Sequence, residues 1–355
     1  MIRRPRLSVL LGIAIVAVFF SQPITAHADE PNQSGGLGPP IDLPNGSSGL
    51  IQQTGIVHFQ MILGRLELDP PRHRKGTKSL RQTEPFELQE RITVSSERGI
   101  PSLHYSWETN HHRVIVNVSD ALNLHLHSQR PDLRTQIALV QPASGPIDVK
   151  LQLDTGELLE SIEVPSLYHL QASHPEIFSQ HIERLLPYLL PGPSIRQLRF
   201  EAERQLLTVT PNRPIPTYGS VQACVERLSD SRRAVRAAAE AELCAFGLPV
   251  LRHIDRFPAE LLETEQRARL QRVRQHLQPR SSDTPARLAS WLSSDHRYWN
   301  LATANFSHEE WLIADRFVHK TCGKHLDSVQ PSPSGLRIAD AIAPHMRSES
   351  YLGSP

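Results

Sequence analysis

Apolar and polar residues alternate along the first half of the chain, from about residue 54 to residue 163. Val114, Val116 and Val118 share one side of a predicted strand, while Ile115 and Asn117 share the other side. A period of two is the pattern of a β-strand with one buried face. Turn-forming residues separate the apolar runs at the spacing of all-β domains. The pattern therefore predicts a β-rich domain over residues 54–165.

The apolar residues recur at helical spacing after residue 165. His174-Pro175-Glu176 opens one such stretch, and a second helix is expected from Ile195 to Leu207. These segments predict connecting helices over residues 166–213. The chain is thus expected to be an α+β multidomain protein, with a small N-terminal β domain followed by an all-α domain.

Residues 217–277 carry two apolar stripes at helical spacing. The first comprises Val221, Cys224, Val225 and Leu228, and the second comprises Val235, Ala238, Ala239, Leu243 and Phe246. Gly247 is expected to end the second helix. Shorter apolar patterns over residues 248–254 and 262–277 complete four antiparallel helices. The alanines at Ala237, Ala238, Ala239 and Ala241 are expected to let a neighbouring helix approach closely.

The segment Val221–Leu251 reads VQACVERLSDSRRAVRAAAEAELCAFGLPVL. It resembles a degenerate HEAT-type repeat, a pair of helices joined by a short Asp/Ser turn. The resemblance implies that Asp230 and Arg236 brace neighbouring turns and that Ala239 lies at a helix contact. The full set of repeat-structural positions is Asp230, Val235, Arg236, Ala239, Leu243 and Gly247. A HEAT-like region is expected over residues 214–279, and a further degenerate helical unit over residues 283–327.

The N-terminus has the features of a signal peptide. Three arginines precede an apolar run from Leu7 to Phe20, which is too short to span a bilayer comfortably, and Ala26-His27-Ala28 fits a signal peptidase site. Residues 1–28 are therefore expected to direct export to the periplasm or the extracellular space, leaving no membrane span. In the alternative, the segment stays uncut and holds the protein at the membrane. A disordered linker is expected at 29–53, and a loosely ordered tail at 328–355.

The order of signal peptide, β domain and helical unit is similar to that of a family of exported bacterial proteins with HEAT-like segments. That resemblance implies an architecture and no chemistry. The chain has 38 Lys and Arg residues and 37 Asp and Glu residues. Without the three arginines of the signal peptide, 35 basic residues face 37 acidic ones, a formal net charge of −2. This balance argues against a nucleic-acid binder.

Two groups of residues are candidates for binding chemistry. His125 and His127 alternate with leucines on one predicted strand, the spacing at which a sheet presents two imidazoles to a metal, although a solvated strand face fits the same pattern. The basic segment at residues 72–81 predicts either an anion-binding loop or a solvated hairpin loop. Its cations are Arg72, Arg74, Lys75, Lys78 and Arg81.

The three cysteines are too few for a disulfide-built scaffold. Cys224 lies in an apolar stripe, and a bridge between Cys224 and Cys244 stays open; Cys322 is expected to be structural. The sequence contains no nucleophile elbow, zinc-protease helix or nucleotide-binding glycine loop, so no catalytic residue and no cofactor is predicted.

These features predict an exported, non-catalytic interaction or scaffold protein of the cell envelope. Its HEAT-like helices would bind another envelope or periplasmic protein. The alternative is a metal-dependent or hydrolytic enzyme with a site near His125 and His127. The sequence leaves the partner and the oligomeric state open.

Overall fold

The computed structural model describes residues 49–83, 87–208 and 215–327. Within these ranges an antiparallel β region is followed by a helical region, which confirms the predicted α+β order. The predicted signal peptide at 1–28, most of the predicted linker and the predicted tail at 328–355 lie outside the described residues. No helix in the described ranges is both long and apolar enough to cross a membrane.

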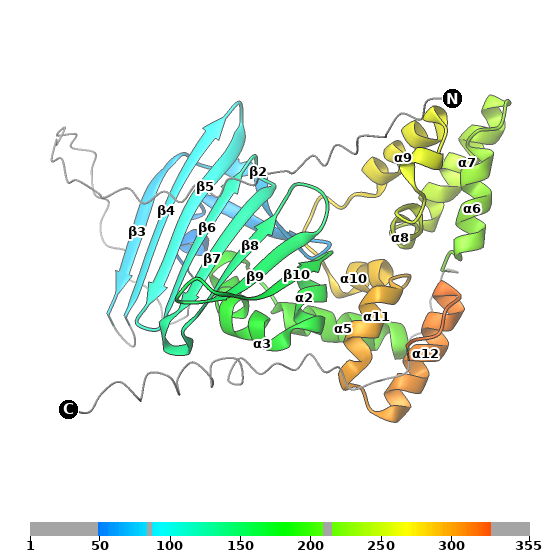
Figure 1. Ribbon diagram of the computed structural model, residues 1–355. Helices are drawn as coiled ribbons and strands as arrows, with labels where there is room; N and C mark the ends of the chain where they lie inside the picture. Colours follow the sequence, from blue (N-terminus) through cyan, green and yellow to red (C-terminus); the bar gives the residue numbers. More distant parts are fainter. Residues whose placement is uncertain (1–48, 84–86, 209–214, 328–355) are drawn as a thin grey trace, which may run out of the picture. The chain divides into compact units, whose positions relative to one another are not determined.

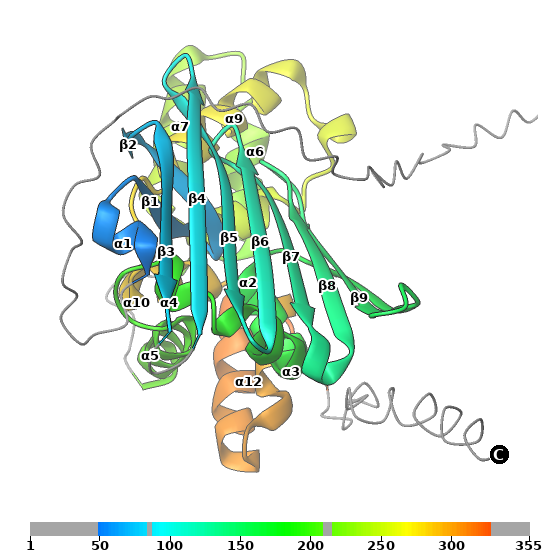
Figure 2. The same cartoon turned by 90° about the vertical axis from the view of Figure 1, so that its left-hand side faces the viewer.

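Eight strands form one antiparallel sheet in which each strand pairs with its neighbours in sequence (Figure 1). They are β3 (Gly76–Gln82), β4 (Leu88–Glu97), β5 (Ile100–Thr109), β6 (His112–Ser119), β7 (Asn123–Arg130), β8 (Thr135–Gln141), β9 (Ile147–Leu153) and β10 (Leu158–Val164). Strands β1 (Val57–Ile62) and β2 (Arg65–His73) form a separate antiparallel pair. Strand β3 lies at one edge of the large sheet, and Figure 2 shows strands β3 to β9 in this order.

The alternation read from the sequence corresponds to the two faces of this sheet. Val114, Val116 and Val118 of β6 are buried, whereas Arg113 and Asn117 are exposed. Because successive side chains of a strand point to opposite faces, one face of the sheet enters the core while the other carries polar side chains. The period of two therefore predicted both the strands and the buried face.

Short helices pack on the sheet and on each other. They are α1 (Leu50–Thr54), α2 (Leu167–Ser173), α3 (Pro175–Phe178), the π-helical segment η2 (Ser179–Glu183) and α4 (Leu186–Leu189), followed by the longer α5 (Ile195–Thr208). The end of the predicted linker is wrong, because Leu50 and Ile51 are buried in α1. The Leu50 amide donates to the buried carboxylate of Glu90, 3.0 Å away, which fixes α1 to β4.

The last three α-helices of the described ranges belong to the same hydrophobic core as the sheet. They are α10 (Pro285–Leu292), α11 (His296–Ala302) and α12 (His308–Cys322). Asp283, just before α10, accepts hydrogen bonds from the amides of Leu63 and Gly64, each at 2.9 Å, and from the Tyr168 hydroxyl at 3.2 Å. The buried Asp283 carboxylate thus joins the C-terminal helices to the β1–β2 turn.

Four helices between these two parts have a hydrophobic core of their own. They are α6 (Tyr218–Arg227), α7 (Arg233–Phe246), α8 (Pro249–Ile254) and α9 (Thr264–Leu277). Their buried apolar residues are Val221, Cys224, Val225, Leu228, Ala239, Leu243, Val250, Ile254, Leu270 and Val273. We call residues 218–277 the helical unit.

Candidate functional site

The helical unit contains the repeat-structural residues named from the sequence. Ala239 and Leu243 of α7 are fully buried, and Val235 and Arg236 are half-buried. Gly247 ends α7 with a backbone φ of +73°, a conformation that glycine adopts without strain. The four predicted helices are present, and the glycine ends its helix as expected.

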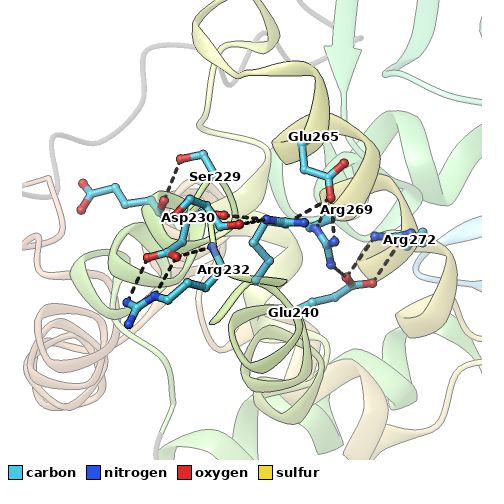
Figure 3. Close-up of polar contacts among 10 residues, drawn as sticks. Ser229, Asp230, Arg232, Glu240, Glu265, Arg269 and Arg272 are labelled. Carbon is cyan, nitrogen blue, oxygen red and sulfur yellow. Dashed lines mark hydrogen bonds and ion pairs between the residues drawn. The ribbon is translucent and has the colours of Figure 1, made fainter. Parts of the chain in front are cut away.

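The turn between α6 and α7 is held by its own side chains (Figure 3). Asp230 Oδ1 accepts from the Arg232 amide at 2.8 Å, and the Arg236 guanidinium donates to the carbonyl oxygens of Asp230 and Ser231 at 2.7 and 2.9 Å. The hydrogen bond from the Arg232 side chain lowers the pKa of Asp230. Arg236 also lies 3.5 Å from the Glu265 carboxylate on α9, so one arginine connects this turn to a second helix.

An ion-pair cluster joins α7 to α9. Glu240 contacts Arg269 at 2.6 Å and Arg272 at 3.1 Å, and Arg269 also contacts Glu265 at 2.6 Å (Figure 3). The hydrogen bond from Arg269 lowers the pKa of Glu265. Arg269 is buried and Glu240 is half-buried, so this pair is shielded from water, whereas Glu265 and Arg272 are more exposed and contribute less.

One side of α7 carries small apolar side chains that point into solvent. The exposed residues of this face, which we call the alanine face, are Ala234, Ala237, Ala238, Ala241 and Ala245. They recur every three or four residues, the spacing of one helix face. The expectation that the alanines meet a neighbouring helix is therefore right for Ala239 and wrong for Ala237, Ala238 and Ala241 within this chain. Alanine lies on both sides of α7, so its pattern could not tell the buried side from the exposed one.

The three cysteines are free thiols. Cys224 and Cys322 are buried and Cys244 is half-buried, so the conceivable bridge between Cys224 and Cys244 is not formed. Burial raises the pKa of the Cys224 thiol, which disfavours the thiolate form. Cys224 acts here as a small apolar side chain of the core.

His125 and His127 lie on the outer face of β7. His125 is exposed, and His127 is half-buried. The residue opposite His125 is Asn117, whose side chain already lies 2.7 Å from the ring of His104. The residues opposite His127 are poor metal ligands. No cluster of three or more His, Cys, Asp or Glu side chains that could hold a metal is found in the described ranges. Structural zinc sites use four protein ligands and catalytic ones three, so the pair has no visible means of completing such a site.

Most of the basic segment is not a loop. Arg72 lies at the end of β2, Arg74 and Lys75 form the short connection, and Lys78 and Arg81 belong to edge strand β3. Arg72 and Arg81 contact Asp69 and Glu87, so part of the positive charge is compensated. Lysines are common on edge strands because they hinder pairing with another chain, which explains why a strand has a loop-like composition here.

A buried polar chain between the sheet and η2 was not predicted. Ser128 Oγ of β7 lies 2.7 Å from His112 Nε2 and 3.0 Å from His181 Nδ1, and Thr135 Oγ1 lies 3.2 Å from His181 Nε2. Burial, followed by the charges of Arg130 and other neighbours, lowers the pKa of His112 to about 4 and that of His181 to about 3. Ser128 has no exposed surface, so this Ser–His contact serves packing and cannot reach a substrate as it stands.

A second set of buried polar side chains connects the helical unit to the hydrophobic core that the sheet shares with α10, α11 and α12. Asp295 contacts Arg252 of α8 at 2.8 Å and His169 of α2 at 3.1 Å, and Arg252 lies 4.2 Å above the Trp291 ring. Burial acts in the opposite direction, but the hydrogen bond from His169 and the charge of Arg252 keep the pKa of Asp295 below its usual range. Asp295 lies 43 positions from Arg252 and 126 from His169, so no spacing in the sequence could have indicated these contacts.

No family model matches this sequence, and the searches of curated proteins and of solved structures gave no significant match. The chemistry of the described residues therefore carries the functional argument.

Proposed function

We propose that the protein is an exported interaction module of the cell envelope that binds another protein through the alanine face of α7. The observation that supports this proposal is the exposure of five alanines on one side of a helix whose other side packs in the core of the helical unit. An ordinary surface helix carries polar or charged residues on its solvent side. The alanine face lacks such residues, which suits a surface that is covered by a bound partner when the protein functions.

The occupant that fits this face is an amphipathic helix of the partner protein. Small side chains allow a second helix to approach the α7 backbone closely and pack its ridges into the alanine grooves. The neighbouring charged residues Glu242 and Glu240 are engaged by Arg227 and Arg269, at 2.6 Å in both cases, so they need no charged partner. In repeat proteins the apolar face of each helix pair is covered by the neighbouring pair. The resemblance to a HEAT-type repeat therefore suggests that the alanine face is a surface that another helix covers.

The test is site-specific photo-cross-linking in intact cells. A photoreactive side chain at Ala238 should give a protein adduct, whereas the same group at the exposed Lys150 on β9 should not. The protein identified from the adduct is then purified, and its affinity is measured for the unchanged chain and for the Ala241→Glu variant. The charged side chain should weaken binding at least tenfold. Equal adducts at both positions, or equal affinity of the variant, would refute the proposal.

A further inference from the structure

A cleft of about 510 Å³ lies where the turn between β5 and β6 meets η2 and α4. This volume is in the range of small-molecule binding sites. The turn contributes Thr109 and Asn110, while Arg184 and Tyr188 come from the helical side. None of the described residues that line the cleft belongs to the helical unit.

One wall of the cleft is aromatic and preformed. The rings of Trp107 and Tyr188 lie 5.4 Å apart between centroids, and the ring of His112 meets Trp107 edge-on at 5.1 Å. Trp107 is only 4% exposed, so its position is fixed by the core. Aromatic rings held in this way bind flat apolar groups without first losing side-chain entropy.

The charges around the cleft favour an anion. Arg184 is exposed and has no hydrogen bond or ion pair within the described part of the chain. Among the described lining residues the carboxylate is that of Glu87, which lies 3.4 Å from Arg81. Glu90, behind the aromatic wall, accepts hydrogen bonds from the Leu50 amide and the Tyr105 hydroxyl, and its burial raises its pKa.

We propose that this cleft binds a small organic anion with a flat apolar body and a single carboxylate. The flat body lies against the half-buried ring of Tyr188, which Trp107 supports from the core, and the carboxylate pairs with the guanidinium of Arg184. A carboxylate fits this position because arginine binds it through two parallel hydrogen bonds. This site is independent of the alanine face, so either proposal can fail without the other.

The probe is 2-naphthoate, titrated into the purified protein by calorimetry and compared with the neutral 2-naphthamide. The anion should bind about fivefold more tightly than the amide, because an ion pair with an exposed guanidinium contributes up to about 1 kcal/mol. Arg184→Gln should remove this difference. Arg91→Gln is the matched control, since Arg91 is exposed on β4 outside the cleft lining and should leave binding unchanged.

The position of the probe is read from the indole N–H signals of the four tryptophans. Saturation with 2-naphthoate should shift the signal that disappears in the Trp107→Phe variant. The proposal is overturned if no binding saturates, if Arg184→Gln binds the anion as tightly as the unchanged chain, or if the cation 2-naphthylmethylammonium binds more tightly than 2-naphthoate. A shift confined to other tryptophan signals would also overturn it.

Discussion

The buried pair of His112 and His181 should make the protein lose stability in mild acid. Both rings are neutral in the folded state. Burial and the charges of Arg130 and Arg184 lower the pKa of His112 to about 4, and burial and the charges of His112 and Arg130 lower that of His181 to about 3. In the unfolded chain each ring titrates near a pKa of 6.5. Protonation therefore favours unfolding, and the stabilisation that exists above pH 6.5 is lost as the pH falls toward the folded-state values.

The magnitude follows from the difference between these pKa values. Between about pH 7.5 and about pH 5, each histidine should lower the free energy of unfolding by about 2 kcal/mol, or about 4 kcal/mol for both. Urea denaturation at several pH values measures this slope. Other groups also contribute to the pH dependence of the unchanged protein, so the comparison is made between variants.

The informative variant carries His112→Gln and His181→Gln, which keep a polar side chain but cannot take up the proton. Its stability at neutral pH should be lower, because the contacts with Ser128 and Thr135 are altered, and its loss between about pH 7.5 and 5 should be about 4 kcal/mol smaller than in the unchanged protein. His111→Gln, at an exposed neighbour, serves as the control. An unchanged slope in the double variant would refute the assignment of the acid sensitivity to this pair.

Three further outcomes are expected. Asp283→Ala should destabilise the protein by about 3 kcal/mol or more in urea denaturation, since it leaves two amides and a tyrosine hydroxyl without their acceptor. Gly64→Ala should also destabilise the protein in the same assay, because the residue has a φ of +73° and its new Cβ would lie 2.6 Å from the Tyr168 ring. By contrast, Gly219→Ala, which has open space in α6, should stabilise the protein by up to about 1 kcal/mol. A reducing agent should leave the thermal midpoint unchanged, because all three cysteines are already free, and a downward shift would contradict the unbridged structure.

Local pattern predicted the regular elements well. The valines of β6 and the apolar stripe that contains Leu243 each repeat with the period of their element, and their burial follows from it. The basic segment was misjudged because strand β3 lies at the sheet edge, where Lys78 and Thr77 face little packing and give no apolar alternation. Composition alone could not separate such an edge strand from a loop.

The candidate sites were harder to predict because they depend on contacts between distant segments. Trp107 and Arg184 line the same cleft although 77 positions separate them in the sequence. Neither residue belongs to a motif whose spacing would have indicated a binding site. The alanine face posed a different problem. Ala237, Ala238 and Ala241 were named from the sequence, but Ala234 and Ala245 were not. A helix with alanine on two sides does not reveal which side its own chain covers, since this depends on where α9 packs.

The helical unit interrupts a single hydrophobic core. That core takes in residues up to Ala202 of α5 and resumes at Leu288 of α10, and these two helices pack against each other. The chain thus leaves and re-enters the core through adjacent helices, the arrangement of one domain inserted into another. An inserted domain can be exchanged or lost while the host keeps its packing. Evolution could therefore alter residues 218–277 without redesigning the sheet, as long as the contacts of Arg252 with Asp295 and Trp291 are kept.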